Sequence, residues 1–272
     1  MRIALIQLGY GDEESLEART DRAGDLVRQQ ADHDLVVLPE LWGAGGFAYR
    51  RWDENAQAVD GPIAQAMAGA ASDAGVLLHA GSLVERPADG GRGPEGKDLW
   101  NTSLVFAPDG TLLTTYRKVH RFGFGQGEPK LMEAGDALAA VDLPDPATGR
   151  TWQAGLSTCY DLRFPELYRA QLDAGATMFV VPAAWPMPRV EHWTLLARAR
   201  AVENQCVVVA CNTAGTHAGV EMGGHSTVVL PTAEVVATAG TDEEVLSVDV
   251  DLQVVDDYRA SFPVLQDRRL PL

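Results

Sequence analysis

The chain has 272 residues, 46% of them hydrophobic, and a formal net charge of −16 from 38 acidic and 22 basic residues. Its length suffices for one large core, and its acidic balance excludes functions that need clustered basic side chains on phosphate backbones. No apolar stretch approaches the roughly 20 residues of a membrane span, and residues 1–11 lack the features of a signal peptide. We therefore expect a single cytoplasmic domain, residues 1–272, with no nucleic acid or membrane partner.

The first half of the chain alternates apolar strand candidates with helix-like stretches and ends in a hairpin. The hairpin occupies residues 101–116, and its turn is formed by the PDG sequence at 108–110. The preceding elements are expected as strands at 2–8, 35–38 and 76–84 and as helices at 14–31 and 62–74.

The second half repeats this pattern. Strands are expected at 152–158, 178–182 and 206–211, helices at 165–174 and 191–204, and a hairpin within 224–240. Alternating strands and helices favour sheets of mixed direction with helices on one face, and two such halves bury their open sheet faces against each other. The sequence therefore predicts an α/β fold, a four-layer α-β-β-α sandwich built from two pseudo-repeated halves.

Cys159 ends an apolar run and opens a helix-like segment. A thiol at a strand-to-helix junction lies near the positive helix N-terminus and free backbone N–H groups, which favour a thiolate and an oxyanion beside it. Such a residue suits a nucleophile. The alternative is a small buried hydrophobic residue, because free cysteine is among the most buried residue types.

Two further segments place charged side chains at strand ends, where α/β proteins commonly have their binding and catalytic residues. Glu40 follows an apolar run and Pro39. Lys118 begins a Gly-rich loop that carries Glu128 near its end. The alternatives are an acid at a helix N-terminus for Glu40, a surface lysine for Lys118 and a solvated loop acid for Glu128, with Glu133 nearby.

Together these segments resemble the nitrilase superfamily of carbon-nitrogen hydrolases. PE at 39–40, KVH at 118–120 and CYDLRFP at 159–165 occur in the family's order, and the resemblance covers roughly residues 1–250. It implies the nitrilase-type four-layer sandwich as one carbon-nitrogen hydrolase domain, no cofactor, and subunits that pair into a homodimer or a higher homo-oligomer.

The resemblance and the chemistry of the residues together suggest a thioester mechanism for hydrolysis of a small linear amide. Cys159 would attack the amide carbon, and Glu40 would act as the general base. Lys118 and the backbone N–H of Tyr160 would stabilise the oxyanion. The resemblance adds Glu128 as a second carboxylate that positions Lys118 and the substrate.

The substrate is indicated by weaker signs. ARAVENQ at 199–205 and GHSTVV at 224–229 are similar to the omega-amidase branch, which hydrolyses terminal amides of 2-oxo dicarboxylic acid monoamides. AWP at 184–186 departs from the NWP of that branch. Deaminated-glutathione amidase, another aliphatic amidase or nitrilase, and a catalytically inactive binding or assembly module on the same fold stay open as alternatives.

Three residues are candidates for substrate binding. Arg163 either clamps a substrate carboxylate or braces its loop by pairing with a carboxylate. Trp185, with Met187 beside it, would wall a small pocket, although such residues are more often simple packing. Phe47 is the third candidate.

The remaining chemistry-bearing residues favour structural roles. His120, two residues from Lys118, is expected to hydrogen-bond structurally rather than to form a Cys-His dyad. The other histidines show no metal-ligand spacing, so no metal site is expected. Cys206 and Cys211 would point to opposite faces of a strand and form no disulfide. Residues 255–272 are expected to form an extended tail that either crosses to a partner subunit or is disordered.

Overall fold

The computed structural model describes residues 1–145 and 148–270, and its strands form two six-stranded sheets of mixed direction. The first sheet has the order β14-β1-β2-β3-β4-β5, and β1, β2 and β3 run parallel. Its strands are β1 (Arg2–Gln7), β2 (Leu35–Val37), β3 (Leu77–Glu85), β4 (Trp100–Phe106), β5 (Leu112–Arg117) and β14 (Glu244–Asp249).

The second sheet repeats this arrangement with the order β13-β12-β9-β8-β7-β6. Its three central strands, β7, β8 and β9, are again parallel. The strands are β6 (Ala140–Asp145), β7 (Arg150–Leu156), β8 (Met178–Pro182), β9 (Val207–Cys211), β12 (Thr227–Val229) and β13 (Val235–Thr238). The short strands β10 (Thr216–His217) and β11 (Val220–Glu221) form a separate hairpin.

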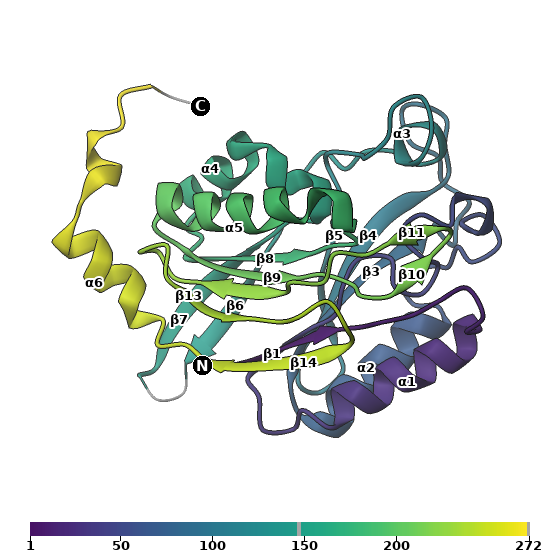
Figure 1. The fold of residues 1–272 in the computed structure, drawn as a ribbon, viewed down its shortest axis with the longest axis horizontal. Coiled ribbons are helices and arrows are strands. Elements are labelled where there is room, and N and C mark those ends of the chain that lie inside the picture. The colour runs from purple at the N-terminus through teal and green to yellow at the C-terminus, as the bar shows by residue number, and fades with distance from the viewer. Residues whose placement is uncertain (146–147, 271–272) are drawn as a thin grey trace.

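Helices cover the outer face of each sheet (Figure 1). The first sheet carries α1 (Leu16–Arg28) and α2 (Pro62–Ala74), and the second carries α4 (Pro165–Asp173) and α5 (Val190–Asn204). The other helical segments are α3 (Glu128–Leu131), α6 (Gln253–Ser261) and the 3₁₀ turns η1 (Tyr49–Arg51), η2 (Cys159–Arg163), η3 (Met187–Arg189) and η4 (Val264–Asp267). Among the described residues, no helix is long and apolar enough to cross a membrane.

The strands alternate their side chains between two cores. In β1, Ile3 and Leu5 pack between the two sheets, whereas Ala4 and Ile6 pack against the helices. The core between the sheets also takes Leu156 from the second sheet. Because each sheet is buried on both faces, the four layers follow directly from this period of two. The predicted α-β-β-α sandwich and its repeated halves are confirmed.

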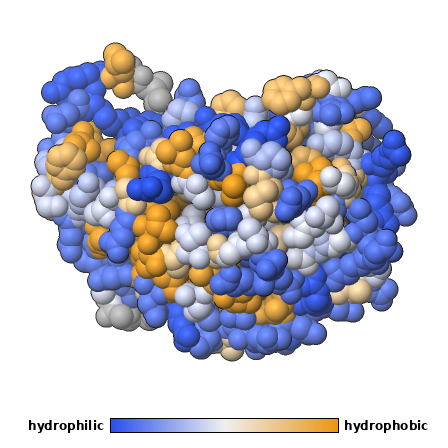
Figure 2. All heavy atoms as spheres, in the orientation of Figure 1, coloured by the Kyte–Doolittle hydropathy of each residue, from blue (hydrophilic) through white to orange (hydrophobic). Residues whose placement is uncertain are grey.

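The apolar surface is uneven on the face seen in Figure 2. Orange side chains gather over the exposed edge of the second sheet, around β13. Val235 and Val236 of this strand are 41% and 37% exposed. Elsewhere on this face hydrophilic side chains predominate, in keeping with the acidic composition.

The expected extended tail begins instead as helix α6, so the prediction for residues 255–261 is wrong. Val255 is fully buried in the core between the sheets, which anchors the helix. Arg259 donates to the carbonyls of Asn204 and Gln205 where α5 ends, and such basic groups stabilise helix C-termini. Further along, Arg268 pairs with Asp173 of α4. Residues 271–272 of the predicted tail lie outside the described residues.

Two buried imidazoles make the fold sensitive to acid. His79 and His217 are each 1% exposed. Burial lowers the pKa of both histidines from 6.5 to about 4. The unfolded chain therefore binds more protons between these pH values, and the stability present above pH 6.5 is lost as the pH falls towards 4. Each histidine should lower the free energy of unfolding by about 2 kcal/mol between pH 7 and pH 5.

Urea unfolding at pH 7 and pH 5 measures this effect. The His79→Asn variant should lose about half of the acid sensitivity that these two histidines contribute. An unchanged difference between the two pH values in this variant would contradict the assignment.

Candidate active site

Glu40 lies on a turn that strand β3 holds in place. Leu38 donates to the His79 carbonyl at 2.9 Å, and the Leu41 N–H donates to Ser82 Oγ at 3.0 Å. The backbone passes so close that a Cβ at Gly81, whose φ is +67°, would lie 1.9 Å from the Pro39 carbonyl oxygen. Only glycine permits this approach. The turn carrying Glu40 is therefore fixed from the first half of the molecule.

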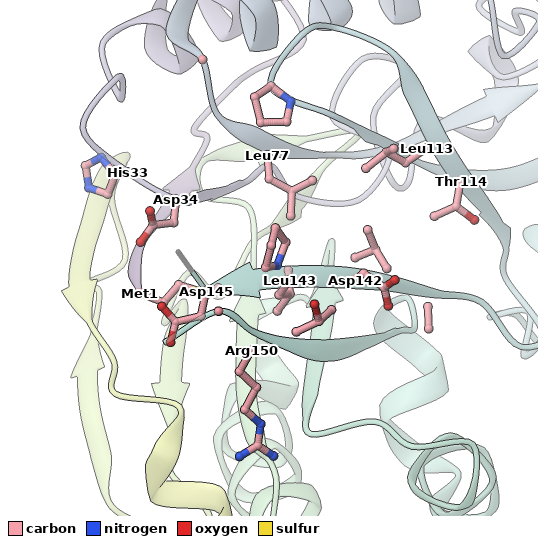
Figure 3. A pocket seen from close by; sticks show the side chains of 17 residues that line it. Met1, His33, Asp34, Leu77, Leu113, Thr114, Asp142, Leu143, Asp145 and Arg150 are labelled. Atoms are coloured by element: carbon pink, nitrogen blue, oxygen red, sulfur yellow. The ribbon is translucent and has the colours of Figure 1, made fainter. Parts of the chain in front are cut away.

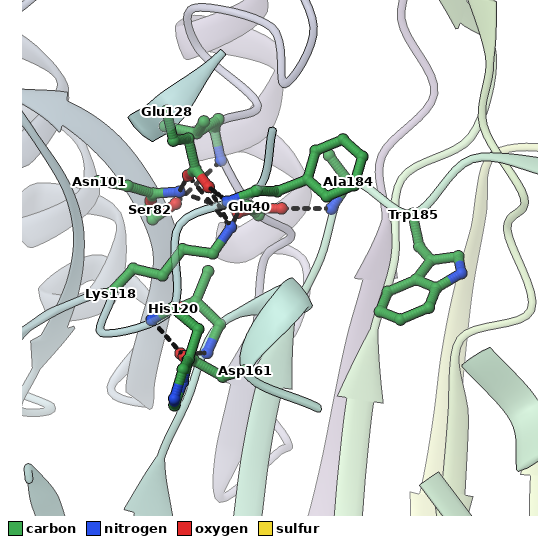
Figure 4. A network of polar contacts seen from close by, with 12 residues as sticks. Glu40, Ser82, Asn101, Lys118, His120, Glu128, Asp161, Ala184 and Trp185 are labelled. Atoms are coloured by element: carbon green, nitrogen blue, oxygen red, sulfur yellow. Dashed lines mark hydrogen bonds and ion pairs between the residues drawn. The ribbon is translucent and has the colours of Figure 1, made fainter. Parts of the chain in front are cut away.

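The Glu40 carboxylate is buried, and both of its oxygens accept hydrogen bonds (Figure 4). Its Oε1 accepts from Lys118 Nζ at 2.7 Å and from Asn101 Nδ2 at 2.8 Å. Its Oε2 accepts from the Ala184 N–H at 2.8 Å, just beyond β8. The carboxylate thus joins the ends of β2 and β8 and lies between the two halves of the fold.

Lys118 follows β5 and is 2% exposed. Its Nζ lies 2.7 Å from Glu40 and 2.8 Å from Glu128 Oε2. Burial opposes the charge, but the negative charges of Glu128 and Glu40 outweigh it and raise the pKa of Lys118 well above its usual value. Lys118 therefore stays an ammonium ion. It is not the surface lysine of the alternative interpretation.

Glu128 begins the short helix α3 and is 3% exposed, so it is not a solvated loop acid. Its Oε1 accepts from Asn101 Nδ2 at 2.6 Å, and its Oε2 accepts from the Phe122 N–H. Burial raises the pKa of Glu128, while Lys118 acts in the opposite direction and Glu40 adds to the rise. Glu133, the other loop carboxylate, accepts from the Lys97 N–H instead.

Cys159 lies where β7 gives way to η2, with a backbone φ of +47°. A non-glycine residue in this region is strained, and such strain clusters at functional sites. Burial and then the negative charge of Glu40 raise the pKa of the Cys159 thiol well above its usual value, against the pull of Lys118. Only a short 3₁₀ turn follows Cys159 in place of the expected helix terminus, and burial outweighs the preference for a thiolate that was expected from that terminus. The resting residue is a thiol.

Asp161 connects the Cys159 and Lys118 segments (Figure 4). This fully buried carboxylate accepts from the N–H of Thr158 at 2.9 Å, from the N–H of His120 at 2.9 Å and from the Tyr116 hydroxyl at 2.7 Å. His120 Nδ1 also lies 2.8 Å from it. The expected structural hydrogen bonding of His120 is confirmed, and Asp161 is the partner that sequence reasoning missed.

The cavity in front of Cys159 has two parts. The inner part is lined by Glu40, Lys118, Glu128 and Cys159. The outer part is walled by aromatic and arginine side chains, and Phe47 belongs to both parts. The residues of the outer part are Phe47, Phe122, Cys159, Tyr160, Arg163, Ala184, Trp185, Pro186 and Arg189. The structure therefore brings together every predicted site residue, whereas Met187 does not line either part.

Arg163 lies over the Trp185 ring, 4.7 Å from its centroid, and its Nη2 lies 3.2 Å from His192 Nδ1. Its contact is thus with an imidazole, not with the carboxylate that the bracing alternative required. The Trp185 Nε1–H donates to the Arg189 carbonyl at 2.7 Å. One indole therefore holds two arginine segments at the mouth of the cavity.

Sequence reasoning missed Asn101 and Arg189. Asn101 lies on β4, where every residue is buried. This strand also carries Thr102 and Ser103, so the available signal was only that polar groups in a buried strand need partners. Arg189 carried a weaker signal, since it only ends the AAWPMPR segment.

A larger groove lies elsewhere (Figure 3). It encloses about 830 Å³ and is lined by residues that include Leu77, Leu113 and Leu143. Its Asp34 accepts from the Arg2 N–H, and its Arg150 pairs with Asp256. No cysteine lines it, so the narrower cavity at Cys159 is the candidate active site. Within residues 1–145 and 148–270, no cluster of three or more His, Cys, Asp or Glu could hold a metal ion.

The arrangement at Cys159 combines three chemical functions. It contains a thiol, a buried carboxylate beside it and a permanently charged ammonium group. A nucleophile, a base and a stabiliser of negative charge, all buried side chains in one cavity, suit acyl transfer.

Comparisons with known proteins agree with this geometry. A family model described as carbon-nitrogen hydrolase matches residues 2–260. A 2-oxoglutaramate amidase from Paenarthrobacter nicotinovorans is 45% identical, with the match covering 98% of this chain and 89% of that protein. Omega-amidase NIT2 from Homo sapiens is 34% identical, with coverage of 100% and 96%.

Solved structures show the same similarity. A CN-hydrolase superfamily protein from Xanthomonas campestris, with an arsenic adduct in its active site, matches with a TM-score of 0.86 and 29% identity over 100% of this chain and 98% of that one. Nit3 from Saccharomyces cerevisiae, a member of branch 10 of the nitrilase superfamily, gives a TM-score of 0.84 and 29% identity, with coverage of 99% and 97%. The similarity extends over nearly the whole chain in sequence and in structure.

Proposed function

Because this chain belongs to the carbon-nitrogen hydrolase family, we propose that it hydrolyses the terminal amide of a 2-oxo dicarboxylic acid monoamide to a carboxylate and ammonia. The observation that carries this proposal is the buried Glu40–Lys118–Glu128 network beside Cys159. Relatives at 45% and 35% identity are named 2-oxoglutaramate amidase, and this name supports the substrate class.

In the first half-reaction Glu40 takes the proton of the Cys159 thiol as the sulfur attacks the amide carbon. The high pKa of the resting thiol makes this transfer necessary. The carbonyl oxygen becomes an oxyanion, stabilised by the Lys118 ammonium and the backbone N–H of Tyr160. Glu40 then gives its proton to the nitrogen, the C–N bond breaks, and ammonia leaves a thioester on Cys159.

In the second half-reaction Glu40 takes a proton from water, and the resulting hydroxide attacks the thioester carbon. The C–S bond breaks, the sulfur regains a proton from Glu40, and the product leaves as a carboxylic acid, which gives its proton to the solvent and becomes the carboxylate. Lys118 cannot share the role of base, because its raised pKa keeps it protonated. Glu128 also holds the Lys118 ammonium in place through its own ion pair.

The outer part of the cavity suits the carboxylate at the far end of such a substrate. Arg163 and Arg189 both line it, and Trp185 contacts both segments. Guanidinium groups bind carboxylates through paired charge-assisted hydrogen bonds. We assign Arg163 and Arg189 to the substrate carboxylate and Phe47 and Trp185 to the apolar walls around the short carbon chain.

Ammonia release from a panel of amides tests the proposed function. The panel contains 2-oxoglutaramate, pentanamide as a neutral amide of the same length, propionamide and a nitrile. We expect kcat/KM to be largest for 2-oxoglutaramate. Turnover of neutral amides alone would keep the thiol chemistry and reject the substrate class, and the absence of turnover throughout would reject both.

The two arginines should control KM for the acidic substrate. Each charge-assisted hydrogen bond contributes about 1.5–3 kcal/mol, so Arg163→Leu or Arg189→Leu should raise KM for 2-oxoglutaramate about 10- to 100-fold. KM for pentanamide should stay unchanged. The matched control is Arg198→Leu, which alters an exposed arginine of α5 that does not line the cavity. An equal rise in KM for acidic and neutral amides would instead indicate that the arginines brace the loop.

Homodimer formation and cytoplasmic location belong to the same proposal. On the outer helix α5, Leu195 is 64% exposed and Val202 is 42% exposed. Apolar side chains on a surface helix favour burial against a second subunit.

A further inference from the structure

We infer that Asn101 is a positioning residue that keeps Glu40 ready to accept the thiol proton by donating one hydrogen bond to each of the two buried carboxylates. The inference rests on the proposed function, because it concerns the base of that reaction. Asn101 does not line the cavity and acts through the Glu40 and Glu128 carboxylates.

The geometry places one amide between two acids (Figure 4). Asn101 Nδ2 lies 2.8 Å from Glu40 Oε1 and 2.6 Å from Glu128 Oε1, and the side chain is buried. An amide nitrogen has two protons, one for each carboxylate. The orientation is fixed by this network, since the reverse would place the amide oxygen against both acids.

Asn101 also anchors the third charged group. Its backbone carbonyl accepts from the Lys118 N–H at 2.9 Å. The backbone of Asn101 therefore holds the chain where Lys118 follows β5. Its side chain holds the two carboxylates. No other residue with described contacts hydrogen-bonds to Glu40, Glu128 and Lys118 together.

The charge balance explains why a neutral donor is needed. Two carboxylates share one ammonium, which leaves one unit of negative charge in the inner part of the cavity, where the described lining residues include no cation besides Lys118. Burial and the negative charge of Glu40 raise the pKa of Glu128, against the pull of Lys118. A hydrogen bond from Asn101 stabilises the charged forms without adding charge, and it opposes the rise in the pKa of Glu128.

The other titratable groups that face the pair do not replace this effect. Cys159 and Lys118 are the reacting thiol and the fixed ammonium. Tyr49 and Tyr10 also face the carboxylates, and burial raises the pKa of both, so their hydroxyls stay neutral at ordinary pH. The acidic limb of the rate profile therefore reports the carboxylate pair.

Asn101→Asp and Asn101→Ser test the inference. Asp keeps the shape and removes the donor nitrogen, and Ser removes the bridge with a smaller side chain. We expect the acidic limb of the pH profile of kcat/KM to move up by about one pH unit or more. At pH values below this limb, kcat/KM should therefore fall by about tenfold or more. KM for 2-oxoglutaramate should change little, because Asn101 does not contact the substrate.

A second readout needs no substrate. The rate of Cys159 alkylation by iodoacetamide is followed against pH in the wild type and both variants, and the variants should need a higher pH for the same rate. The matched control is Asn204→Ser, which removes a fully buried amide bonded to the Arg200 carbonyl of α5. Its pH profiles should match the wild type.

The outcomes separate this inference from the proposed function. If the wild type turned over none of the amides, the proposed function would be rejected, while the alkylation profiles would still test the role of Asn101. Unshifted alkylation and rate profiles in the Asn101 variants, or an equal shift in Asn204→Ser, would overturn the inference. Failure of both Asn101 variants to fold, with Asn204→Ser folded, would assign Asn101 to folding and overturn it as well.

Discussion

Replacing Cys159 with alanine is expected to lower kcat/KM for 2-oxoglutaramate at least about 10⁴-fold, because the nucleophile cannot be replaced by water at the same position. The fold should survive. Alanine also carries a Cβ, so the backbone strain at a φ of +47° does not change. Ammonia release and thermal unfolding, measured on the same preparation, check both parts.

The chain supplies two matched controls for this variant. Cys206 and Cys211 are also buried thiols, but they lie away from the cavity. Cys206→Ala and Cys211→Ala should keep turnover within a few fold of the wild type. Amide turnover that persists in Cys159→Ala, or that disappears equally in all three variants, would remove Cys159 as the nucleophile.

Replacing Glu40 with glutamine should be nearly as damaging. Glutamine keeps the size of the side chain but cannot take the thiol proton, and the resting thiol has a pKa well above its usual value. General base catalysis contributes about 10²–10⁴-fold, and both half-reactions use this base, so kcat should fall at least about 10³-fold. Alkylation of Cys159 at neutral pH should slow in the same variant, because no carboxylate takes the thiol proton as the sulfur attacks iodoacetamide.

Glu133→Gln is the control for Glu40→Gln. Glu133 is also a carboxylate with 3% exposure, but it bonds to the loop at Lys97 and does not line the cavity. This variant should keep its turnover. Comparable losses in both variants would mean that any buried carboxylate matters for folding, and a nearly active Glu40→Gln would remove Glu40 as the base.

The layers of the fold could be predicted because apolar strands alternate with helices along both halves of the chain. The central strands are continuous apolar runs, as expected for strands buried on both faces, and in β1 Ile3 and Leu5 face one core and Ala4 and Ile6 the other. The strands that close the two sheets were not predicted. Residues 244–249 and 140–145 pair with β1 and β7 as edge strands, and most of their residues are exposed or half-buried, so no apolar run marks them.

The sequence motifs also led to the charged residues of the site, since Glu40, Lys118 and Cys159 each follow an apolar run at a strand end. Their supporting residues were missed. Asn101 and Asp161 act through contacts across 61 and 41 positions of the chain, which no local pattern reveals. The raised pKa of the Cys159 thiol was not predicted, because it depends on burial and on Glu40, which are properties of the assembled cavity.

The most direct test of the account is the mass of the chain during turnover. Wild-type protein is mixed with 2-oxoglutaramate, quenched in acid within one turnover, and mapped by peptide mass spectrometry. The account predicts the acyl group of the substrate as a thioester on Cys159, formed together with one equivalent of ammonia. Ammonia release without an acyl group on Cys159, or with the group on another residue, would contradict it.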